Sequence, residues 1–432
     1  MRETPNGWIW ARLVDAAEVI GRARAVEDAP DLPELTFRGV LANGVTVPGE
    51  AISGVQATAK GMTRAVPGDI VVTSQGHVSG WVGKKVAAIA SNSYVASTLQ
   101  VVRPHETCID GRFLLHQLRS ERVYQELQAL AGARTSLGRK GFGQLGVLIA
   151  PLAEQRRIVE ALEEQLSRLD AAEAGLVGAA QKRRAVDGLT LDRVLDARGP
   201  LTAIGDLVAA ERKIAYGVLQ PGDHCEGGVP LVRVGDIAGG AVAADLKRID
   251  PAVAAQYPRT QLRGGEVLLT IVGTIGRTAV APIGLAGANV ARAVALIPVG
   301  LDADPRFVAF ALGAPKSVRR LTGLAHEVAR KTLNLEDVRK FQIPLPPLEN
   351  QREIVASTTA VLSRLAALEH AITVVSAKGD ALRRSILESA FRGELVPQDP
   401  SDDPASVLLE RIADERAATS KPAREQRERT PA

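Results

Sequence analysis

The sequence predicts an α+β protein in which two pseudo-repeated globular domains are separated by two long antiparallel helices that form a coiled coil. Three observations predict this architecture. The chain of 432 residues is too long for one hydrophobic core, and its 46% of apolar residues is enough for two. One segment, at 151–173, occurs again at 347–369. In both copies and in the residues after them, apolar side chains recur at helical spacing.

The internal repeat divides the chain. Residues 151–173 read PLAEQRRIVEALEEQLSRLDAAE, and residues 347–369 read PLENQREIVASTTAVLSRLAALE, so that about half of the positions match. Upstream, PGDIVVTSQG at 67–76 lies over GGEVLLTIVG at 264–273. We therefore predict the following order: a globular domain at 1–150, a spacer helix at 151–197, a second globular domain at 198–346, a second spacer helix at 347–395, and a short helix with a charged disordered tail at 396–432.

The two globular segments contain short β-branched runs. The runs at 69–73 and 266–270 are bounded by Gly and Pro at turn spacing, which is typical of buried strands. Polar loops follow both runs, at 73–77 and 270–274. Hydroxyl groups and backbone amides at strand ends are places where function often lies.

Apolar positions in the two helical segments advance alternately by three and four residues, which is typical of a coiled-coil seam. Because a globular domain separates them, the two helices should pair with each other in antiparallel orientation. A helical hairpin buried in an ordinary core is the alternative. The predicted seam residues are Ile158, Leu162, Leu169, Leu176, Ile354, Val361, Leu365, Leu368, Ile372 and Leu382.

Composition excludes several classes of protein. A net charge of +4 permits nucleic acid as a partner, but only 3% of residues are aromatic, which counts against a protein that stacks single-stranded bases on rings. Two cysteines without a CxxC spacing exclude a zinc ribbon or a disulfide scaffold. The N-terminus lacks a signal-peptide pattern, and no stretch approaches the roughly 20 apolar residues of a membrane span. We expect a soluble cytoplasmic protein that does not contact a membrane.

Several longer motifs resemble one known family. The phrases APLAEQRRIVEALEEQLSRLDAAEAGL at 150–176, FQIPLPPLENQREIVA at 341–356 and LRRSILESAFRGELVPQDPSDDPASVLLERIADER at 382–416 are similar to the specificity subunits of type I restriction-modification systems. The run PLVRVGDIAGG at 230–240 resembles that family's target recognition domains. The first helix start departs from the pattern, with Ile149-Ala150-Pro151-Leu152 in place of IPLPPL.

The resemblance implies a non-catalytic reader of double-stranded DNA in a phage-defence system. Each globular segment would be a target recognition domain that reads one half of a bipartite asymmetric site. The helices would set the spacer between the halves and dock two methyltransferase subunits, through which the restriction and translocase subunits would bind. S-adenosylmethionine, ATP and Mg are expected on those partner subunits, and no cofactor on this chain.

Catalytic motifs are absent from the sequence. A DNA methyltransferase should contain an Asn/Asp-Pro-Pro-Tyr/Phe loop, but the pair Pro346-Pro347 is flanked by leucines and does not form this motif. The GxxxxGK[ST] phosphate loop of an ATPase does not occur either. His224 and Cys225 are adjacent in what the sequence predicts to be a polar turn. Such a pair is more often an incidental part of a turn than a metal site. We predict neither catalytic residues nor a metal site in this chain.

Candidate DNA-binding residues are the polar side chains of the loops in both globular segments, because Arg, Lys, Asn and Gln match base edges and cations and hydroxyls match phosphates. Any one of them could instead be a solvated charge or a structural cap. They are Arg38, Ser74, Gln75, His77, Lys84, Lys85, Asn92, Arg134, Arg139, Lys140, Arg212, Lys213, Tyr216, Arg233, Thr274, Arg277, Asn289, Arg292, Arg330 and Lys331.

Two other classes of function compete with a DNA reader. A coiled-coil scaffold with two protein-binding heads would have no affinity for duplex DNA. A self-contained nuclease or methyltransferase would be active without a partner. A reader should bind duplex with an affinity that falls steeply with salt, by about 0.9 in log affinity per log salt for each phosphate contacted.

Overall fold

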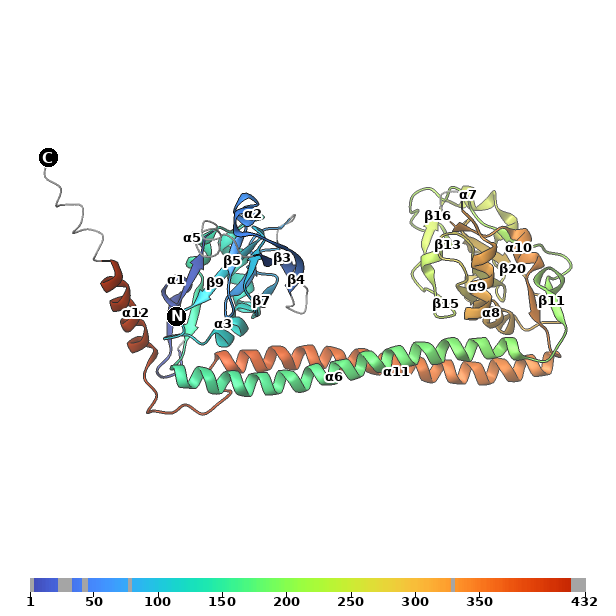
Figure 1. Ribbon diagram of the computed structural model, residues 1–432. Coiled ribbons are helices and arrows are strands. Elements are labelled where there is room, and N and C mark those ends of the chain that lie inside the picture. The colour runs from blue at the N-terminus through green and yellow to red at the C-terminus, as the bar shows by residue number, and fades with distance from the viewer. Residues whose placement is uncertain (1–3, 22–32, 41–45, 77–79, 328–330, 421–432) are drawn as a thin grey trace. The chain divides into compact units, whose positions relative to one another are not determined.

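The structure is a computed structural model that describes residues 4–21, 33–40, 46–76, 80–327 and 331–420. The chain forms two units, Met1–Ala174 with Ser376–Ala432, and Gly175–Val375. Helix α6 (Leu152–Asp192) and helix α11 (Leu348–Phe391) each contribute to both units (Figure 1). Each unit thus combines one globular part with a part of both long helices.

Unit 1 contains two four-stranded sheets and a two-stranded ribbon. The first sheet is antiparallel throughout, in the order β2 (Ala17–Ile20), β9 (Leu99–Pro104), β6 (Ile70–Thr73) and β7 (Val86–Ala88). The second has the order β4 (Thr46–Ile52), β3 (Glu34–Val40), β8 (Ser93–Val95) and β5 (Thr63–Ala65), with β3 and β8 parallel. The ribbon pairs β1 (Ile9–Arg12) with β10 (Gly146–Ile149). The helices besides α6 and α11 are α1 (Leu13–Ala16), α2 (Gly54–Ala59), α3 (Gly111–Leu118), α4 (Glu121–Ala131), α5 (Arg139–Gly143) and α12 (Ala405–Ser420).

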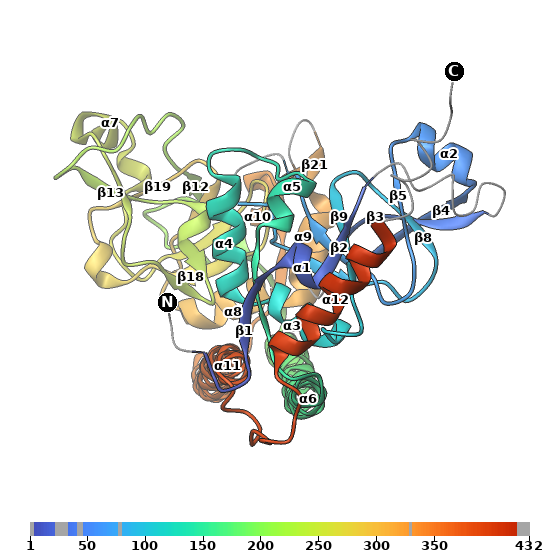
Figure 2. The same cartoon turned by 90° about the vertical axis from the view of Figure 1, so that its left-hand side faces the viewer.

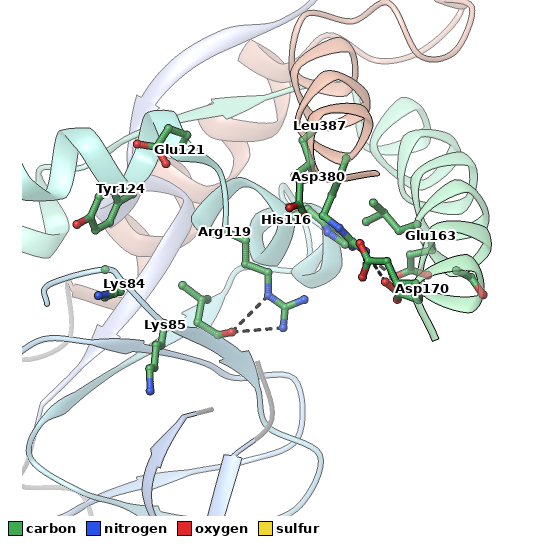
Figure 3. A pocket seen from close by; sticks show the side chains of 16 residues that line it. Lys84, Lys85, His116, Arg119, Glu121, Tyr124, Glu163, Asp170, Asp380 and Leu387 are labelled. Atoms are coloured by element: carbon green, nitrogen blue, oxygen red, sulfur yellow. Dashed lines mark hydrogen bonds and ion pairs between the residues drawn. The ribbon is translucent and has the colours of Figure 1, made fainter. Parts of the chain in front are cut away.

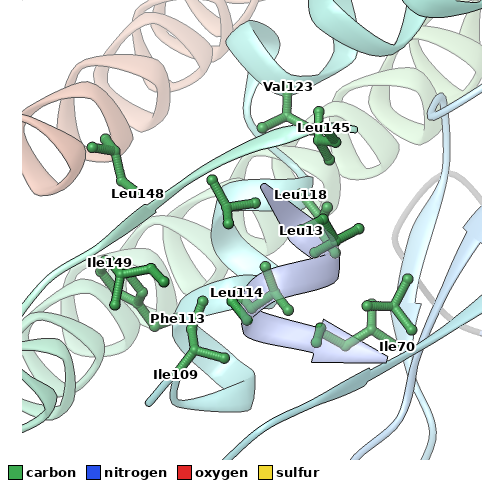
Figure 4. Close-up of a cluster of buried hydrophobic side chains, with 14 of the residues drawn as sticks. Leu13, Ile70, Ile109, Phe113, Leu114, Leu118, Val123, Leu145, Leu148 and Ile149 are labelled. Atoms are coloured by element: carbon green, nitrogen blue, oxygen red, sulfur yellow. The ribbon is translucent and has the colours of Figure 1, made fainter. Parts of the chain in front are cut away.

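The core of unit 1 lies around helix α3 (Figure 4). Phe113 and Leu114 of this helix are buried in the same cluster as Ile70 of β6 and Leu13. The helix begins at Asp110, whose side chain accepts hydrogen bonds from two backbone N–H groups of the first turn. The capped helix thereby fills the space beside the sheet with its apolar face.

Unit 2 also contains a four-stranded antiparallel sheet, a sheet with one parallel pair and a two-stranded ribbon. Its four-stranded antiparallel sheet has the order β12 (Ala215–Tyr216), β20 (Val294–Ile297), β17 (Val267–Thr270) and β18 (Thr278–Val280). A three-stranded sheet has the order β16 (Lys247–Ile249), β13 (Val229–Val232) and β19 (Asn289–Val290), again with a parallel pair, β13 and β19. A ribbon pairs β11 (Leu201–Ala203) with β23 (Gln342–Pro344). The remaining elements are β14 (Ile237–Ala238), β15 (Ala241–Val242), β21 (His326–Glu327), β22 (Lys331–Thr332), α7 (Pro251–Ala255), α8 (Pro305–Gly313), α9 (Pro315–Leu324) and α10 (Leu335–Lys340).

Helices α3 and α8 occupy corresponding places in the two units. The N-cap of α8 is Asp304, which accepts from the backbone N–H groups of Arg306 and Phe307, as Asp110 does at the start of α3. Phe307 is buried in the core of unit 2. The α+β class predicted from the sequence agrees with this mixture of helices and sheets.

Within unit 1, α6 and α11 lie side by side (Figures 1 and 2). Arg383 of α11 contacts Asp170 of α6 at 2.5 Å and Glu173 at 3.4 Å. Ile158 and Leu162 of α6 are buried in the same cluster as Ile386 of α11. Apolar packing and ion pairs together hold this part of the helix pair.

Unit 2 contains a matching contact between the other parts of these helices, where Arg183 of α6 lies 3.4 Å from Glu369 of α11. Two predicted seam residues are exposed rather than buried: Leu368 is 45% exposed and Leu382 is 51% exposed. For Leu368 and Leu382 the seam prediction is wrong. The predicted seam residues that are half-buried are Leu169, Leu176, Ile354, Val361, Leu365 and Ile372.

One described helix is long and apolar enough to cross a membrane by length and composition. It is α11, in which a stretch has a mean hydropathy of 1.3, and none of that stretch is buried. This corrects the expectation that no segment approaches such a composition. The same helix contains Arg364 and Glu369, and it packs against α6 through Glu369.

Candidate nucleic-acid interface

The candidate interface in unit 2 lies at one end of the four-stranded sheet. Strand β17 ends at Thr270, and residues 271–277 connect it to β18. Thr274 and Arg277 of this connection are exposed. The Thr270 hydroxyl accepts a hydrogen bond from the backbone N–H of Arg277 at 2.9 Å, which fixes where the turn returns to the sheet.

Three further predicted residues lie at the same end of this sheet. Strand register pairs Tyr216, the last residue of β12, with Ala295 near the start of β20. Arg292 immediately precedes β20, and its backbone N–H donates to the carbonyl of Val218. Lys331 lies in β22, and its carbonyl accepts from Gly273 at 3.0 Å. The exposed cations Arg277, Arg292 and Lys331 are thus brought together with Tyr216 by adjoining strand ends.

Glycine is required in the loop between β17 and β18. Gly273 and Gly276 have φ of 75° and 94°, a region that L residues with a side chain rarely adopt. A Cβ atom on Gly276 would lie 2.6 Å from the Val318 side chain. The tight turn therefore holds the polar side chains next to it in a defined position.

Unit 1 joins the corresponding segments by the same hydrogen bonds. The backbone N–H of Leu137 donates to Ser74 at 2.9 Å, and that of Gly76 donates to Thr135 at 3.0 Å. In unit 2 the equivalent bonds run from Leu333 to Ile271 at 2.9 Å and from Gly273 to Lys331 at 3.0 Å. Isolated bridges between Gln75 and Ser136 and between Val272 and Thr332 complete the match. We call these two places, the described residues 74–76 and 80–85 with 134–137 and residues 271–277 with 331–333, the sheet-end loops.

The sheet-end loop of unit 1 contains two lysines beside an indole ring. The ammonium groups of Lys84 and Lys85 lie 5.2 and 5.5 Å from the centre of the Trp81 ring. Thr73 at the end of β6 donates its hydroxyl hydrogen to the Trp81 carbonyl at 2.8 Å. Gln75 is exposed in the same loop. Cations held near a ring keep their charge available to an anionic partner.

A cavity of about 890 Å³ in unit 1 lies between this loop, helix α3 and the two long helices (Figure 3). Lys84, Lys85 and Arg119 line the side formed by the globular part, whereas Glu163 and Asp170 line the side formed by α6. Arg119 donates to the carbonyl of Val86 at 3.3 Å (Figure 3). The two signs of charge face each other, so the cavity does not present a field of one sign.

His116 is the most strongly perturbed titratable group of this cavity. Burial lowers its pKa to about 4, and the positive charges of Arg119 and Arg112 act in the same direction. The Glu163 carboxylate is 3.8 Å away. The imidazole is therefore neutral at physiological pH.

Four predicted DNA-binding residues are committed to other contacts. Asn289 is 1% exposed and donates to Tyr257, so the expectation that it lies on an exposed loop is wrong. Arg212 forms a half-buried ion pair with Glu266 at 2.5 Å. Arg134 is exposed and donates to two carbonyls at the end of α4. Ser74 is buried, so the expectation that its side chain lies on an exposed loop is wrong.

The remaining predicted residues are distributed over both units. Arg233 is exposed but pairs with Asp236 at 3.0 Å. Three predicted positions, His77, Arg330 and the side chain of Arg38, lie outside the described part of the chain. The others are exposed away from the sheet-end loops as defined: Asn92, Arg139, Lys140 and Lys213.

Sequence reasoning overlooked two groups of residues. Thr135 and Ser136 are exposed beside Gln75, and backbone contacts with Gln75 and Gly76 bring them to the sheet end. Gln155 and Gln351 are fully buried at the starts of the two long helices. Their identity in the two copies of the repeat was the available signal. Among the described residues, no group of three or more His, Cys, Asp or Glu side chains is placed to hold a metal ion.

Comparison with known proteins identifies relatives of this chain. Residues 220–374 match the family model for the type I restriction modification DNA specificity domain. The chain is 35% identical over 306 residues to the type I restriction enzyme EcoBI specificity subunit of Escherichia coli, a match that spans 63% of this chain and 64% of that protein, slightly under two thirds of its length. It is 25% identical over 385 residues to the EcoKI specificity subunit of E. coli strain K12, over 82% of each chain.

Two solved structures share the fold. One, from work on complex assembly and conformational transition of the type I R-M system, has a TM-score of 0.75 at 21% identity and covers 91% of this chain and 100% of its own. The HsdS subunit from Thermoanaerobacter tengcongensis has a TM-score of 0.56 at 21% identity and covers 91% of this chain and 98% of its own. The resemblance that the sequence motifs indicate is thereby confirmed.

Proposed function

We propose that this chain, a member of the specificity subunits of type I restriction-modification systems, reads double-stranded DNA and catalyses no reaction itself. Each unit reads one half of a bipartite asymmetric site through its sheet-end loop. The observation that carries this proposal is the recurrence of one loop arrangement, with the same backbone hydrogen bonds, in both units. Two matching readers suit a polymer that offers two separated half-sites.

The chemistry of the sheet-end loops supports contact with duplex DNA. Arg277, Arg292 and Lys331 of unit 2 are exposed cations at one strand end, and Lys84 and Lys85 provide cations in unit 1. Phosphate contacts of this kind position a protein on the duplex, whereas Arg and Gln side chains match the edges of guanine and adenine. We assign base reading to Arg277 and Gln75, and phosphate binding to the lysines and Arg292.

The long helices set the spacing between the two half-sites. A continuous helix of 41 residues, as α6 is, has a length of about 60 Å. We propose that α6 and α11 form an antiparallel coiled coil along this length, so that the gap between the half-sites is measured and its bases are left unread. The ion pairs of Asp170 with Arg383 and of Arg183 with Glu369 support this orientation.

Other subunits perform the reactions. The chain would dock two methyltransferase subunits on its helices, and the restriction and translocase subunits would bind through them in the cytoplasm. S-adenosylmethionine, ATP and Mg would be held by those partners. The apolar stretch of α11 that has a mean hydropathy of 1.3 and is not buried supports the presence of a protein partner on this helix.

A salt titration of duplex binding tests the proposal. The full chain is mixed with a fluorescent duplex of random sequence, and its affinity is measured by anisotropy over a range of salt. We expect log affinity to fall with log salt, and the variant with Arg277, Arg292 and Lys331 changed to Ala to lose about 0.9 of slope per lost phosphate contact. The control variant, Arg306→Ala, changes an exposed cation at the opposite end of the sheet. An affinity that is absent or independent of salt would contradict the proposal and favour a protein-binding scaffold.

A further inference from the structure

Two buried glutamine side chains lie where the long helices begin. Gln155 in the first turns of α6 is fully buried. Its Oε1 atom accepts a hydrogen bond from the backbone N–H of Asp110 at 2.8 Å. Its Nε2 atom donates to the carbonyl of Cys108 at 2.9 Å and to that of Ala150 at 2.8 Å. One amide thus satisfies three backbone groups from two other segments.

Gln351 makes the corresponding set of bonds at the start of α11. Its Oε1 atom accepts from the backbone N–H of Asp304 at 2.8 Å, and its Nε2 atom donates to the carbonyls of Pro346 at 2.8 Å and Asp302 at 3.5 Å. This side chain is also fully buried. The same three segments are therefore tied together in both units.

Each amide connects the helix to the globular part. Asp110 and Asp304 are the N-caps of α3 and α8, the helices that pack into the two cores. Ala150 directly follows strand β10, and Pro346 lies shortly after strand β23. The amide therefore holds the start of the long helix against both the end of a strand and the cap of a core helix.

No other side chain of this size offers the same chemistry. A glutamine amide both accepts and donates, whereas a glutamate accepts only and a methionine does neither with comparable strength. A buried backbone N–H or carbonyl that loses its hydrogen-bond partner lowers the stability of the fold. The amide therefore favours one geometry of the contact between the start of the long helix and the globular part. Arg112 and Glu163, 3.0 Å apart, add a contact between α3 and α6, but this pair is exposed and adds little rigidity.

We propose that Gln155 and Gln351 are positioning residues that fix the angle between each globular part and its long helix, and thereby set how strictly the spacer of the DNA site is read. The first half of this inference concerns the protein alone. The second half rests on the proposed function, because it requires that the chain reads a bipartite duplex.

A distance measurement tests the first half without DNA. Spin labels are placed on Ala129 of α4 and Ala171 of α6, both exposed residues of unit 1, in the full chain with Cys225 changed to Ser. Cys108 is retained because it is buried. We expect a narrow distribution of distances in the parent and a broadened or shifted one in Gln155→Met and in Gln155→Asn, whose amide is too short to reach all three partners.

Gln117→Met is the matched control. Gln117 is 1% exposed, and its amide also binds backbone, accepting from Leu148 at 2.9 Å and donating to the same residue at 2.7 Å. It joins α3 to β10 within the globular part and does not touch α6. Its loss should lower stability while the distance distribution stays as in the parent. The same distance distribution in the parent and both Gln155 variants, or an equal broadening or shift in Gln117→Met, would overturn the inference.

Spacer selectivity tests the second half. The complex with its methyltransferase partners is given duplexes that carry the methylated site of the parent with its own spacer or with one base pair added or removed. We expect Gln155→Asn and Gln351→Asn to lower the preference for the parent spacer by about fivefold or more, with both half-sequences unchanged. An unchanged preference alongside a broadened distance distribution would overturn the link to spacer reading. Failure of the parent to bind any duplex would instead overturn the proposed function.

Discussion

The two units share a framework and differ in their loops. In both, a four-stranded antiparallel sheet, a capped core helix and a buried glutamine at the start of a long helix occur in the same order. The connection after the third strand of that sheet differs: β6 and β7 are separated by more residues than β17 and β18, and the described part of the first connection contains Trp81, whereas residues 271–277 form a short glycine turn in unit 2. The framework thus sets geometry, and the loops are free to set which bases are read.

Replacing one unit's globular part tests this division most severely. Exchange of residues 198–340 for those of a relative should replace one half-sequence of the methylated site completely and leave the other half as it was, because each sheet-end loop belongs to one unit. Methylation mapping of cells that carry the chimera, with the parent chain as control, measures the result. A change in both half-sequences would show that the units do not read independently.

Lengthening the framework should change the spacer alone. One heptad added after Ala174 in α6 and another after Val375 in α11 extend the helices by about 10 Å, which corresponds to about three base pairs along the duplex axis. The same mapping should give the parent half-sequences with a spacer longer by that amount. A constant spacer with altered half-sequences would refute the role of the helices as a measure of distance.

A single difference between the core helices should make unit 1 sensitive to acid. His116 of α3 lies where α8 has Phe310, in register from the N-caps. In the folded chain the pKa of His116 is lowered to about 4, whereas in the unfolded chain the imidazole has its ordinary pKa of about 6.5. Between these pH values the unfolded chain takes up a proton at His116 and the folded chain does not. The free energy of unfolding should therefore fall between about pH 6.5 and pH 4, by up to about 3 kcal/mol.

Denaturation over this pH range measures the effect. The variant His116→Phe, which makes α3 resemble α8 at this position, should lose that part of the pH dependence. Arg112→Ala serves as the control, because it removes a lesser cause of the pKa shift and should leave most of the dependence in place. A pH profile of His116→Phe that matches the parent would show that another group causes the sensitivity.

Single changes at this end of the unit 2 sheet, in the loop and directly before β20, should have the smallest effects, and they separate base reading from phosphate binding. Arg277→Ala should cost about 1–3 kcal/mol of binding and relax selectivity at one base position, whereas Arg292→Ala should weaken binding to all sequences and lower the salt slope by about 1. Anisotropy titrations against duplexes that vary at each position distinguish the two outcomes. Equal effects of both variants on every sequence would contradict the assignment of Arg277 to a base.

The sequence predicts the framework well because repetition and burial leave strong patterns. The β-branched runs become β6 and β17, and the helix starts fall at Leu152 and Leu348, directly after the prolines of the repeated phrase. Apolar periodicity predicts less about the seam. Leu368 and Leu382 satisfy the heptad rule but are exposed, because heptad spacing alone does not determine how much of a side chain the neighbouring helix covers.

The loops are harder to predict because polar residues have several uses. Arg212 and Asn289 are residue types that contact DNA, yet Arg212 holds Glu266 and Asn289 holds a carbonyl inside unit 2. The Arg212 guanidinium and backbone N–H groups keep the pKa of Glu266 below its ordinary value despite burial of the carboxylate. Sequence spacing does not distinguish such an internal ion pair from a surface cation, whereas strand register does.

A methylation map of cells with and without this chain, in the presence of its methyltransferase partners, tests the central claim most directly. The account predicts a set of adenines methylated only when the chain is present, within sites that consist of two short half-sequences separated by a gap of constant length and variable sequence. One continuous recognition sequence, a gap of variable length, or identical maps in the two strains would contradict it.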